Sequence, residues 1–246
     1  EQALAVCGLA GQCVLIGVPR PFRLAMEKAA RAKFKLPPSH LLLNASHTHS
    51  GPMIRVVRPI GKDALVRPAT ASYDNIPADQ EARRVAETIA YMAKLQTTLL
   101  GLIGDCIKNL QPAKLAYSHA RCGFAMNRRL PVKGGFRNSP YPDGPVDHDV
   151  PVLQLRGTDG KILGILFGYA CHNTTTGTMN FNGDYAGWAQ EYLEADNPGA
   201  VALFVTGCGA DQNPYPRGTI DLAKKHGRSL ATAVEAGLIA NLKTLA

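Results

Sequence analysis

The chain has 246 residues, of which 46% are hydrophobic and 19% are charged. This composition is typical of a globular protein with a buried core, and it excludes a disordered chain. The net charge of +8 would suit a nucleic-acid-binding protein, but the lysines and arginines are scattered and have no aromatic residues between them. We therefore expect a basic, solvated surface and no nucleic-acid partner.

Simple patterns exclude further classes of protein. No apolar run approaches the ~20 residues that a membrane-spanning helix needs. The six cysteines show no CxxC pair, which argues against a zinc ribbon or a disulfide framework. The chain opens on Glu1-Gln2-Ala3 without the basic and apolar segments of a signal peptide, and we expect it to be a fragment trimmed at both ends.

The first half of the chain predicts strands that alternate with helices. The apolar residues of the first helix recur at helical spacing, and those of the second form one stripe that we interpret as core packing. In chain order we expect a hairpin, a helix, a buried strand, a proline-rich loop beside the site and a long helix, at residues 3–18, 19–35, 41–43, 53–77 and 78–110.

The second half continues with more strands and two helices. An Asp159-Gly160 pair predicts a type I′ hairpin turn, and Asp184 is the expected N-cap of the helix that follows it. In chain order we expect a strand, a long loop, two hairpin strands, a helix, a strand and a helix, at residues 113–120, 121–149, 150–155, 161–170, 188–195, 200–206 and 220–242. This order favours an α/β fold with a mixed sheet flanked by helices, an active site at the strand ends, and a single, truncated domain over residues 1–246.

A pair of histidines lies in the segment HLLLNASHTHSGP at residues 40–52. In an extended chain, alternate residues point to the same side, so His47 and His49 would face one space roughly 7 Å apart. An imidazole at the end of a strand is a common zinc ligand. The alternative is a polar loop with two surface histidines.

A second buried strand ends in a comparable way. It delivers His172 into a threonine-rich turn, with Asp184 further on, and the next strand feeds a loop that contains Gly209, Asp211 and Asn213. Because sites form at the carboxyl ends of strands in α/β sheets, we expect these loops to share one crevice. The glycines indicate either an oxyanion or phosphate site or a tight connection.

Histidines from two strands together with an acid predict a zinc site. A catalytic zinc ion keeps about three protein ligands and one open position, lowers the pKa of bound water and polarises a carbonyl, which is the chemistry of amide or ester hydrolysis. Arg128 and Arg129 lie in the long loop and could hold an anionic or polar substrate group. A purely surface role for these arginines stays open.

Five motifs resemble the catalytic domain of the neutral/alkaline, non-lysosomal ceramidase family over most of the chain. They are HLLLNASHTHSGP, NRR, ILFGYACHNTTTG, FNGDYAGWAQEYLE and VTGCGADQNP, at residues 40–52, 127–129, 165–177, 181–194 and 205–214. The resemblance implies a hydrolase of sphingolipid metabolism, a zinc amidase that cleaves the N-acyl bond of a lipid substrate presented at a membrane surface. It also implies a secreted or periplasmic location.

The resemblance implies roles for individual residues. His47 and His172 are the expected zinc ligands, His49 a catalytic or substrate-orienting group, and Arg128 the active-site arginine. We further expect Asp211 and Asn213 to take part in catalysis. The residues expected to bind the substrate are Asn127, Asp184 and Gly209.

Two departures from the family pattern shape the expected mechanism. The family's serine-containing loop reads Gly209-Ala210-Asp211-Gln212-Asn213-Pro214 here, so we expect zinc-bound water to attack the carbonyl in place of a serine. The family's remaining zinc ligands, a Glu and a Tyr, have no counterpart in this sequence. The polar loops favour a smaller amide or ester over ceramide itself, and the alternative function is a non-catalytic ligand- or metal-binding domain of the same fold.

Overall fold

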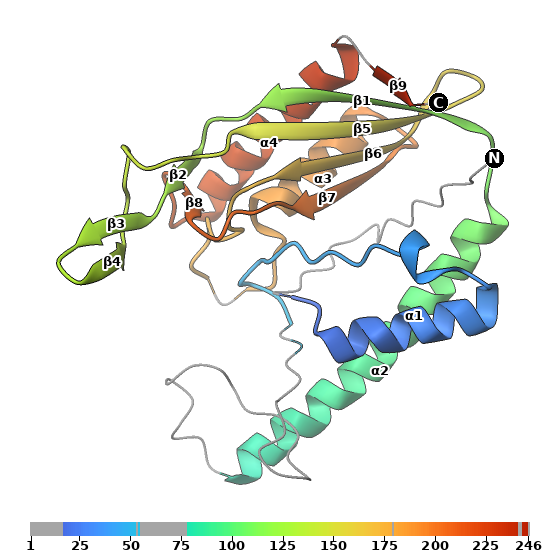
Figure 1. Ribbon diagram of the computed structural model, residues 1–246, viewed down its shortest axis with the longest axis horizontal. Coiled ribbons are helices and arrows are strands. Elements are labelled where there is room, and N and C mark those ends of the chain that lie inside the picture. The colour runs from blue at the N-terminus through green and yellow to red at the C-terminus, as the bar shows by residue number, and fades with distance from the viewer. Residues whose placement is uncertain (1–16, 53, 55–77, 179, 241–242, 246) are drawn as a thin grey trace. The chain divides into compact units, whose positions relative to one another are not determined.

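The structure is a computed structural model that describes residues 17–52, 54, 78–178, 180–240 and 243–245 (Figure 1). Most of the predicted hairpin at 3–18 and of the predicted loop at 53–77 lies outside the described residues. The chain divides into two compact units, the first built from Gly17–Leu43 and the described residues of 53–110, the second from Asn44–Pro52 and the described residues of 111–246. The expectation of a single domain over 1–246 stays a prediction.

The first unit contains the two predicted helices. They are α1 (Arg20–Phe34) and α2 (Ala78–Lys108), with a short 3-10 helix, η1 (Pro38–His40), after α1. A Cβ atom on Gly104 of α2 would lie 3.0 Å from the Phe34 ring of α1, so the glycine leaves room for that ring. None of the helices in the described part of the chain is long and apolar enough to cross a membrane.

The predicted buried strand at 41–43 was wrong. Residues 41–48 have no regular secondary structure, and Leu42 is 73% exposed. An apolar run predicts burial, but a strand also needs a neighbour to accept its backbone hydrogen bonds. Here the N–H of Leu41 turns back to the carbonyl of Pro38, so the leucines leave η1 in an irregular segment.

The second unit is built on a five-stranded mixed sheet, which confirms the predicted fold class. The strand order is β7-β6-β5-β1-β9, in which β6 and β7 are parallel and the other neighbours antiparallel. The strands are β1 (Ala113–Arg121), β5 (Asp149–Gly157), β6 (Ile162–Tyr169), β7 (Val201–Thr206) and β9 (Lys243–Leu245).

Two helices, α3 (Asp184–Asp196) and α4 (Ile220–Ile239), lie behind this sheet in Figure 1. They pack closely because α4 has a glycine at the contact: a Cβ atom on Gly227 would lie 2.5 Å from the Cβ atom of Trp188. Ser118 of β1 donates a hydrogen bond to the carbonyl of Gly237 at 2.7 Å, which ties α4 to the sheet. The core between helices and sheet includes Phe167 and Leu230.

The expected loop at 121–149 contains short strands. They are β2 (Ala125–Asn127), β3 (Arg129–Val132) and β4 (Gly135–Asn138). β3 and β4 form a hairpin, whereas β2 pairs with β8 (Gln212–Pro214). Strands of three or four residues are too short to show a period of two, so the sequence pattern could not reveal them.

Two local predictions were also wrong. At the β5–β6 hairpin, Gly160 has a φ of 81° while Asp159 is not in the left-handed region, and the N–H of Gly160 bonds to the carbonyl of Gly157. That is a type I turn followed by a left-handed glycine, not type I′. Helix α3 has Gly183 as its N-cap, and Asp184 is its first residue, because the Asp184 carboxylate bonds mainly to another loop.

Candidate metal centre

Two parallel strands deliver the main part of the site. β6 ends at Tyr169 and is followed by Cys171 and His172, and its neighbour β7 ends at Thr206 and is followed by Gly207–Ala210. Neighbouring parallel strands end at the same edge of a sheet, so the loops that follow β6 and β7 lie together. A Cβ atom on Gly209 would lie 2.4 Å from the backbone nitrogen of Cys171. Only glycine allows this approach, which favours the tight-connection interpretation of the loop.

The segment Asn44–Pro52 is held against these loops by hydrogen bonds that involve side chains. The N–H of Thr206 donates to Asn44 Oδ1 at 3.1 Å, and its hydroxyl donates to the carbonyl of Ala45 at 2.8 Å. Asn173 donates to the carbonyl of Ser46. Thr48 is fully buried and donates to the carbonyl of Asn182 at 3.0 Å. His47 and His49 are therefore fixed on either side of a buried threonine.

His47 has a φ of 60°, which is the left-handed region. For a residue with a Cβ atom this conformation costs about 1–2 kcal/mol, and it persists only where surrounding contacts impose it. The sequence predicted an extended chain with the two histidines roughly 7 Å apart. The bend brings the ring centroids of His47 and His49 to 5.2 Å instead.

The three histidines converge on one space. The His172 centroid lies 4.8 Å from that of His47 and 5.9 Å from that of His49. One ring nitrogen of each histidine lies within 4.8 Å of the others. Nitrogens bound to one zinc ion are ~3.4 Å apart, given bonds of about 2.0–2.1 Å in a tetrahedral arrangement. Small side-chain rotations would thus allow the three imidazoles to share a metal ion.

The protonation of His172 is set by its surroundings. Its Nδ1 lies 2.7 Å from the carbonyl oxygen of Gly209, which can only accept, so Nδ1 carries the proton and Nε2 keeps a lone pair. Burial and the nearby charge of Arg128 lower the pKa of His172 to about 4, against the effect of the Gly209 bond. A neutral imidazole held by its other nitrogen is the usual form of a metal-binding histidine.

Arg128 joins the loops around His172. Its Nη2 donates to His172 Nε2 at 3.1 Å and to the carbonyl of Ala210 at 2.8 Å, its Nε to the same carbonyl at 3.0 Å, and its Nη1 to Asn213 Oδ1 at 3.2 Å. The pairing of β2 with β8 brings Arg128 here, since its N–H bonds to the carbonyl of Asp211 at 2.7 Å. The structure thus brings Arg128 and Asn213 together with His172.

Asn127 and Asp211 lie one step further from the histidines. Asn127 is 3% exposed, its Nδ2 bonds to Pro145 at 2.8 Å and to Asp211 Oδ2 at 3.5 Å, and its Oδ1 accepts the N–H of Arg129 at 2.8 Å. These bonds orient the Asn-Arg-Arg segment. The predicted substrate-binding role of Asn127 and catalytic role of Asp211 stay predictions.

Asp184 is a buried hydrogen-bonding centre. Its carboxylate accepts the N–H of Thr175 at 3.0 Å and that of Tyr185 at 2.8 Å, and both the N–H and the hydroxyl of Thr176, at 2.8 and 3.0 Å. The Thr176 hydroxyl in turn lies 3.3 Å from that of Ser50. Asp184 therefore connects the loop after His172 to the segment that holds His47 and His49, and its predicted contact with a substrate stays a prediction.

The glycine amides proposed for an oxyanion or phosphate site are bonded within the protein. The N–H of Gly207 bonds to Tyr169 at 3.1 Å and that of Gly209 to Gly207 at 2.8 Å. The backbone carbonyl of Gly209 instead accepts the hydrogen bond from His172 Nδ1. Sequence reasoning missed the supporting roles of Thr48, Asn173 and Asn182, which show no motif because their partners lie in distant loops.

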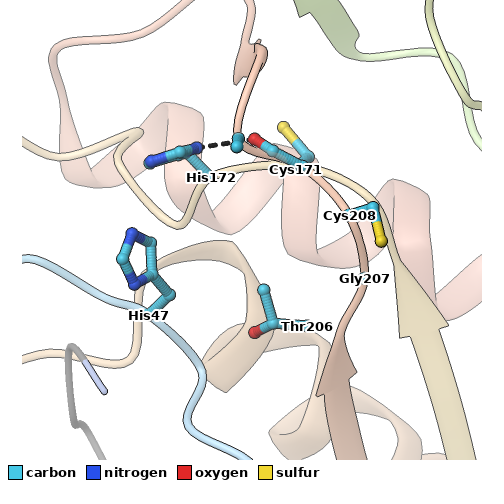
Figure 2. Close-up of a pocket in the computed structure, with 8 residues that line it drawn as sticks. His47, Cys171, His172, Thr206, Gly207 and Cys208 are labelled. Carbon is cyan, nitrogen blue, oxygen red and sulfur yellow. Dashed lines mark hydrogen bonds between the residues drawn. The ribbon is translucent and has the colours of Figure 1, made fainter.

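A pocket of about 210 Å³ lies beside the cluster, lined by His47, His172, Thr206, Cys208 and Ala210 among others. The rings of His47 and His172 lie close together there (Figure 2). Its volume is below the ~300 Å³ at which pockets for drug-sized ligands begin. It therefore suits the reacting part of a substrate better than a long apolar chain.

Neither a known family model nor a curated protein sequence matches this chain. The solved structures similar to it include neutral ceramidase from Pseudomonas aeruginosa, with a TM-score of 0.62, and a ceramidase complexed with C2, with a TM-score of 0.63, each at 19% sequence identity over 91% of the chain. The chain spans about a third of those proteins, 35% and 34% of their length. Over the part that these structures cover, the chain has the fold of neutral ceramidase.

Proposed function

We propose that this chain forms the centre of a metal-dependent hydrolase that cleaves a C–N amide bond. The observation that carries the proposal is the convergence of His47, His49 and His172, with the lone pair of His172 Nε2 fixed by the Gly209 carbonyl. The ceramidase fold supports the choice of an amide as the bond.

The donor set fits zinc. Imidazole nitrogens suit Zn²⁺, which takes about three protein ligands in catalytic sites, and His47 and His172 would hold it with His49 within reach. A bound zinc ion supplies Lewis acidity, which polarises an amide carbonyl and lowers the pKa of water.

Three side chains have further roles in the proposed reaction. Arg128 Nη2 donates to His172 Nε2 at 3.1 Å. A metal ion on Nε2 would take over that lone pair and leave the N–H free to bind the carbonyl oxygen of the substrate as negative charge develops on it. Asn213 orients this guanidinium through Nη1. The imidazole of His49, whose ring centroid lies 5.9 Å from that of His172, can transfer a proton to or from the reacting group.

The nucleophile in this proposal is water. The loop Gly209-Ala210-Asp211-Gln212-Asn213-Pro214 offers no hydroxyl to carry an acyl group, and the Asn213 side chain is buried and bonded to Arg128. The substrate class suggested by the fold is an N-acyl lipid, including one at a membrane surface, while the small pocket favours a shorter amide. The secreted or periplasmic location stays a prediction.

Zinc content and amide hydrolysis test the proposal together. We expect about one zinc per chain by elemental analysis, and little in a His47→Ala, His172→Ala double variant. His119→Ala is the matched control, because His119 lies on β1 and its ring pairs with Asp149. A chelator should abolish hydrolysis of an N-acyl amide, and added zinc should restore it.

The outcomes separate the proposed function from its alternative. Zinc that is lost in the double variant but accompanied by no amide hydrolysis would favour a non-catalytic metal-binding domain of the same fold. A protein without zinc, or with the same zinc content in parent and double variant, would contradict the metal site itself.

A further inference from the structure

Two arginines meet at the edge of the pocket. The carbonyl of Ala210, which lines the pocket with His47 and His172, accepts three N–H groups: Arg128 Nε at 3.0 Å, Arg128 Nη2 at 2.8 Å and Arg129 Nη2 at 3.2 Å. A carbonyl oxygen has two lone pairs, so three donors exceed its capacity. The two guanidinium groups are thus crowded around one neutral acceptor.

Arg128 and Arg129 have more N–H donors than there are acceptors in contact with them. Each guanidinium has five N–H donors. Within the described residues, the side-chain bonds of Arg128 and Arg129 reach the Ala210 carbonyl, Asn213 Oδ1 and His172 Nε2. All three acceptors are neutral. In the described part of the chain, neither arginine forms an ion pair with a carboxylate.

The acid nearest to these arginines along the backbone hydrogen bonds is Asp211. Its backbone carbonyl accepts the N–H of Arg128 at 2.7 Å, while its Oδ2 lies 3.5 Å from the Asn127 amide. Among the described residues, neutral acceptors alone therefore hold the two guanidinium groups together at the pocket edge, an arrangement that a bound anion would stabilise.

We infer that the substrate carries an oxyanion group, a carboxylate, phosphate or sulfate, which Arg128 and Arg129 hold at the pocket edge next to the three histidines. Planar guanidinium groups match the two oxygens of such a group. The inference rests on the proposed function and narrows its substrate to N-acyl compounds with an acidic head group, in place of the uncharged head group of ceramide.

Pairs of neutral and acidic ligands with the same N-acyl group test this inference without relying on turnover. We would measure calorimetrically the binding of N-acetylglycine, N-acetylglycinamide, N-acetylethanolamine and its O-phosphate, with chelator and with zinc. The acidic ligands should bind about tenfold more tightly than the neutral ones, because hydrogen bonds to a charged acceptor are stronger than those to a neutral one. Comparing the carboxylate with the phosphate identifies the preferred oxyanion.

Variants of the arginines test whether these side chains cause the preference for acidic ligands. Arg129→Gln should reduce the preference for the acidic ligand several-fold, and the Arg128→Gln, Arg129→Gln double variant should nearly abolish it. Lys161→Gln is the matched control: it removes the same charge from an exposed side chain at the turn before β6, the opposite end of the strand from His172. It should leave the preference unchanged. Circular dichroism would verify that each variant is folded.

Three results would overturn the inference. They are equal affinity for acidic and neutral ligands, no binding of either at millimolar concentration, and acidic ligands that bind only with zinc and equally well in the arginine variants. Preference for the acid in a protein that hydrolyses no amide would contradict the proposed function and leave the anion site standing. Hydrolysis of neutral and acidic amides at equal rates would contradict the anion site and leave the proposed function standing.

Discussion

The histidines of the site are positioned in two different ways. His172 follows the last residues of a central strand whose backbone is paired on both sides, and a backbone carbonyl sets its tautomer. His47 and His49 lie in a segment without regular structure, held by the side chains of Thr48, Asn173 and Thr206. One half of the site thus depends on the sheet. The other depends mainly on side-chain hydrogen bonds, together with one backbone bond from the N–H of Asn182 to the carbonyl of Ser50 at 3.0 Å.

We call the loops around His172 the His172 half of the site, and the segment with His47 and His49 the His47 half. Mutations in the two halves should have different effects. Disturbing the His172 half should reduce the stability of the whole sheet unit, because its loops are in backbone contact with each other. Disturbing the His47 half should mainly weaken metal binding, because few core residues depend on that segment. Asp184, bonded to Thr176 and through it to Ser50, is one of the residues that join the two halves.

The largest effect is expected for Gly209→Ala. The new methyl group would lie 2.4 Å from the nitrogen of Cys171 and 2.6 Å from the carbonyl carbon of Ala170, so one of the two backbones must move. We expect a loss of about 2–3 kcal/mol in the free energy of unfolding, measured by urea denaturation. Zinc affinity should fall about tenfold or more, because the carbonyl that orients His172 moves as well.

A second glycine in the same region is the control. A Cβ atom on Gly177 would meet no atom within 4 Å, and its φ is not in the left-handed region. Gly177→Ala should therefore leave stability and zinc affinity close to those of the parent. Equal effects of the two substitutions would contradict the close approach of the Gly209 loop to Cys171.

The sequence predicted the His172 half better than the His47 half, for a physical reason. The apolar residues of β6 mark a central strand, so the position of His172 at its end followed directly. The leucines before His47 carry a similar apolar signal, but none of the strands that the structure describes pairs with them. Arg128 reaches the site through the pairing of β2 with β8, and three-residue strands 85 positions apart give no periodic signal.

A smaller loss of stability, with an equally large loss of zinc affinity, is expected for Thr48→Val. The substitution keeps the shape of the side chain but removes the donor to the Asn182 carbonyl and the acceptor for the N–H of Ser50. Leaving buried groups without partners should cost about 1–2 kcal/mol of unfolding free energy. Zinc affinity should fall as much as in Gly209→Ala despite the smaller loss of stability, because His47 and His49 flank this residue.

The control for this variant is Thr97→Val. Thr97 is exposed on α2 and bonds only to the carbonyl one turn earlier, so its loss should change stability by less than about 0.5 kcal/mol. If Thr48→Val lowered stability as much as Gly209→Ala and left zinc affinity intact, the division of the site into a sheet-supported and a side-chain-supported half would be wrong.

The smallest effect tests the left-handed backbone of His47 alone. Both His47→Ala and His47→Gly remove the imidazole, but at a φ of 60° only alanine retains a Cβ penalty. His47→Gly should therefore be more stable than His47→Ala by about 1 kcal/mol. At His49, which is not in the left-handed region, the order should reverse, since glycine only adds freedom to the unfolded chain there. If the alanine variant were more stable than the glycine variant at both positions, the bend at His47 would carry no strain. The fold would then not force the two imidazoles together.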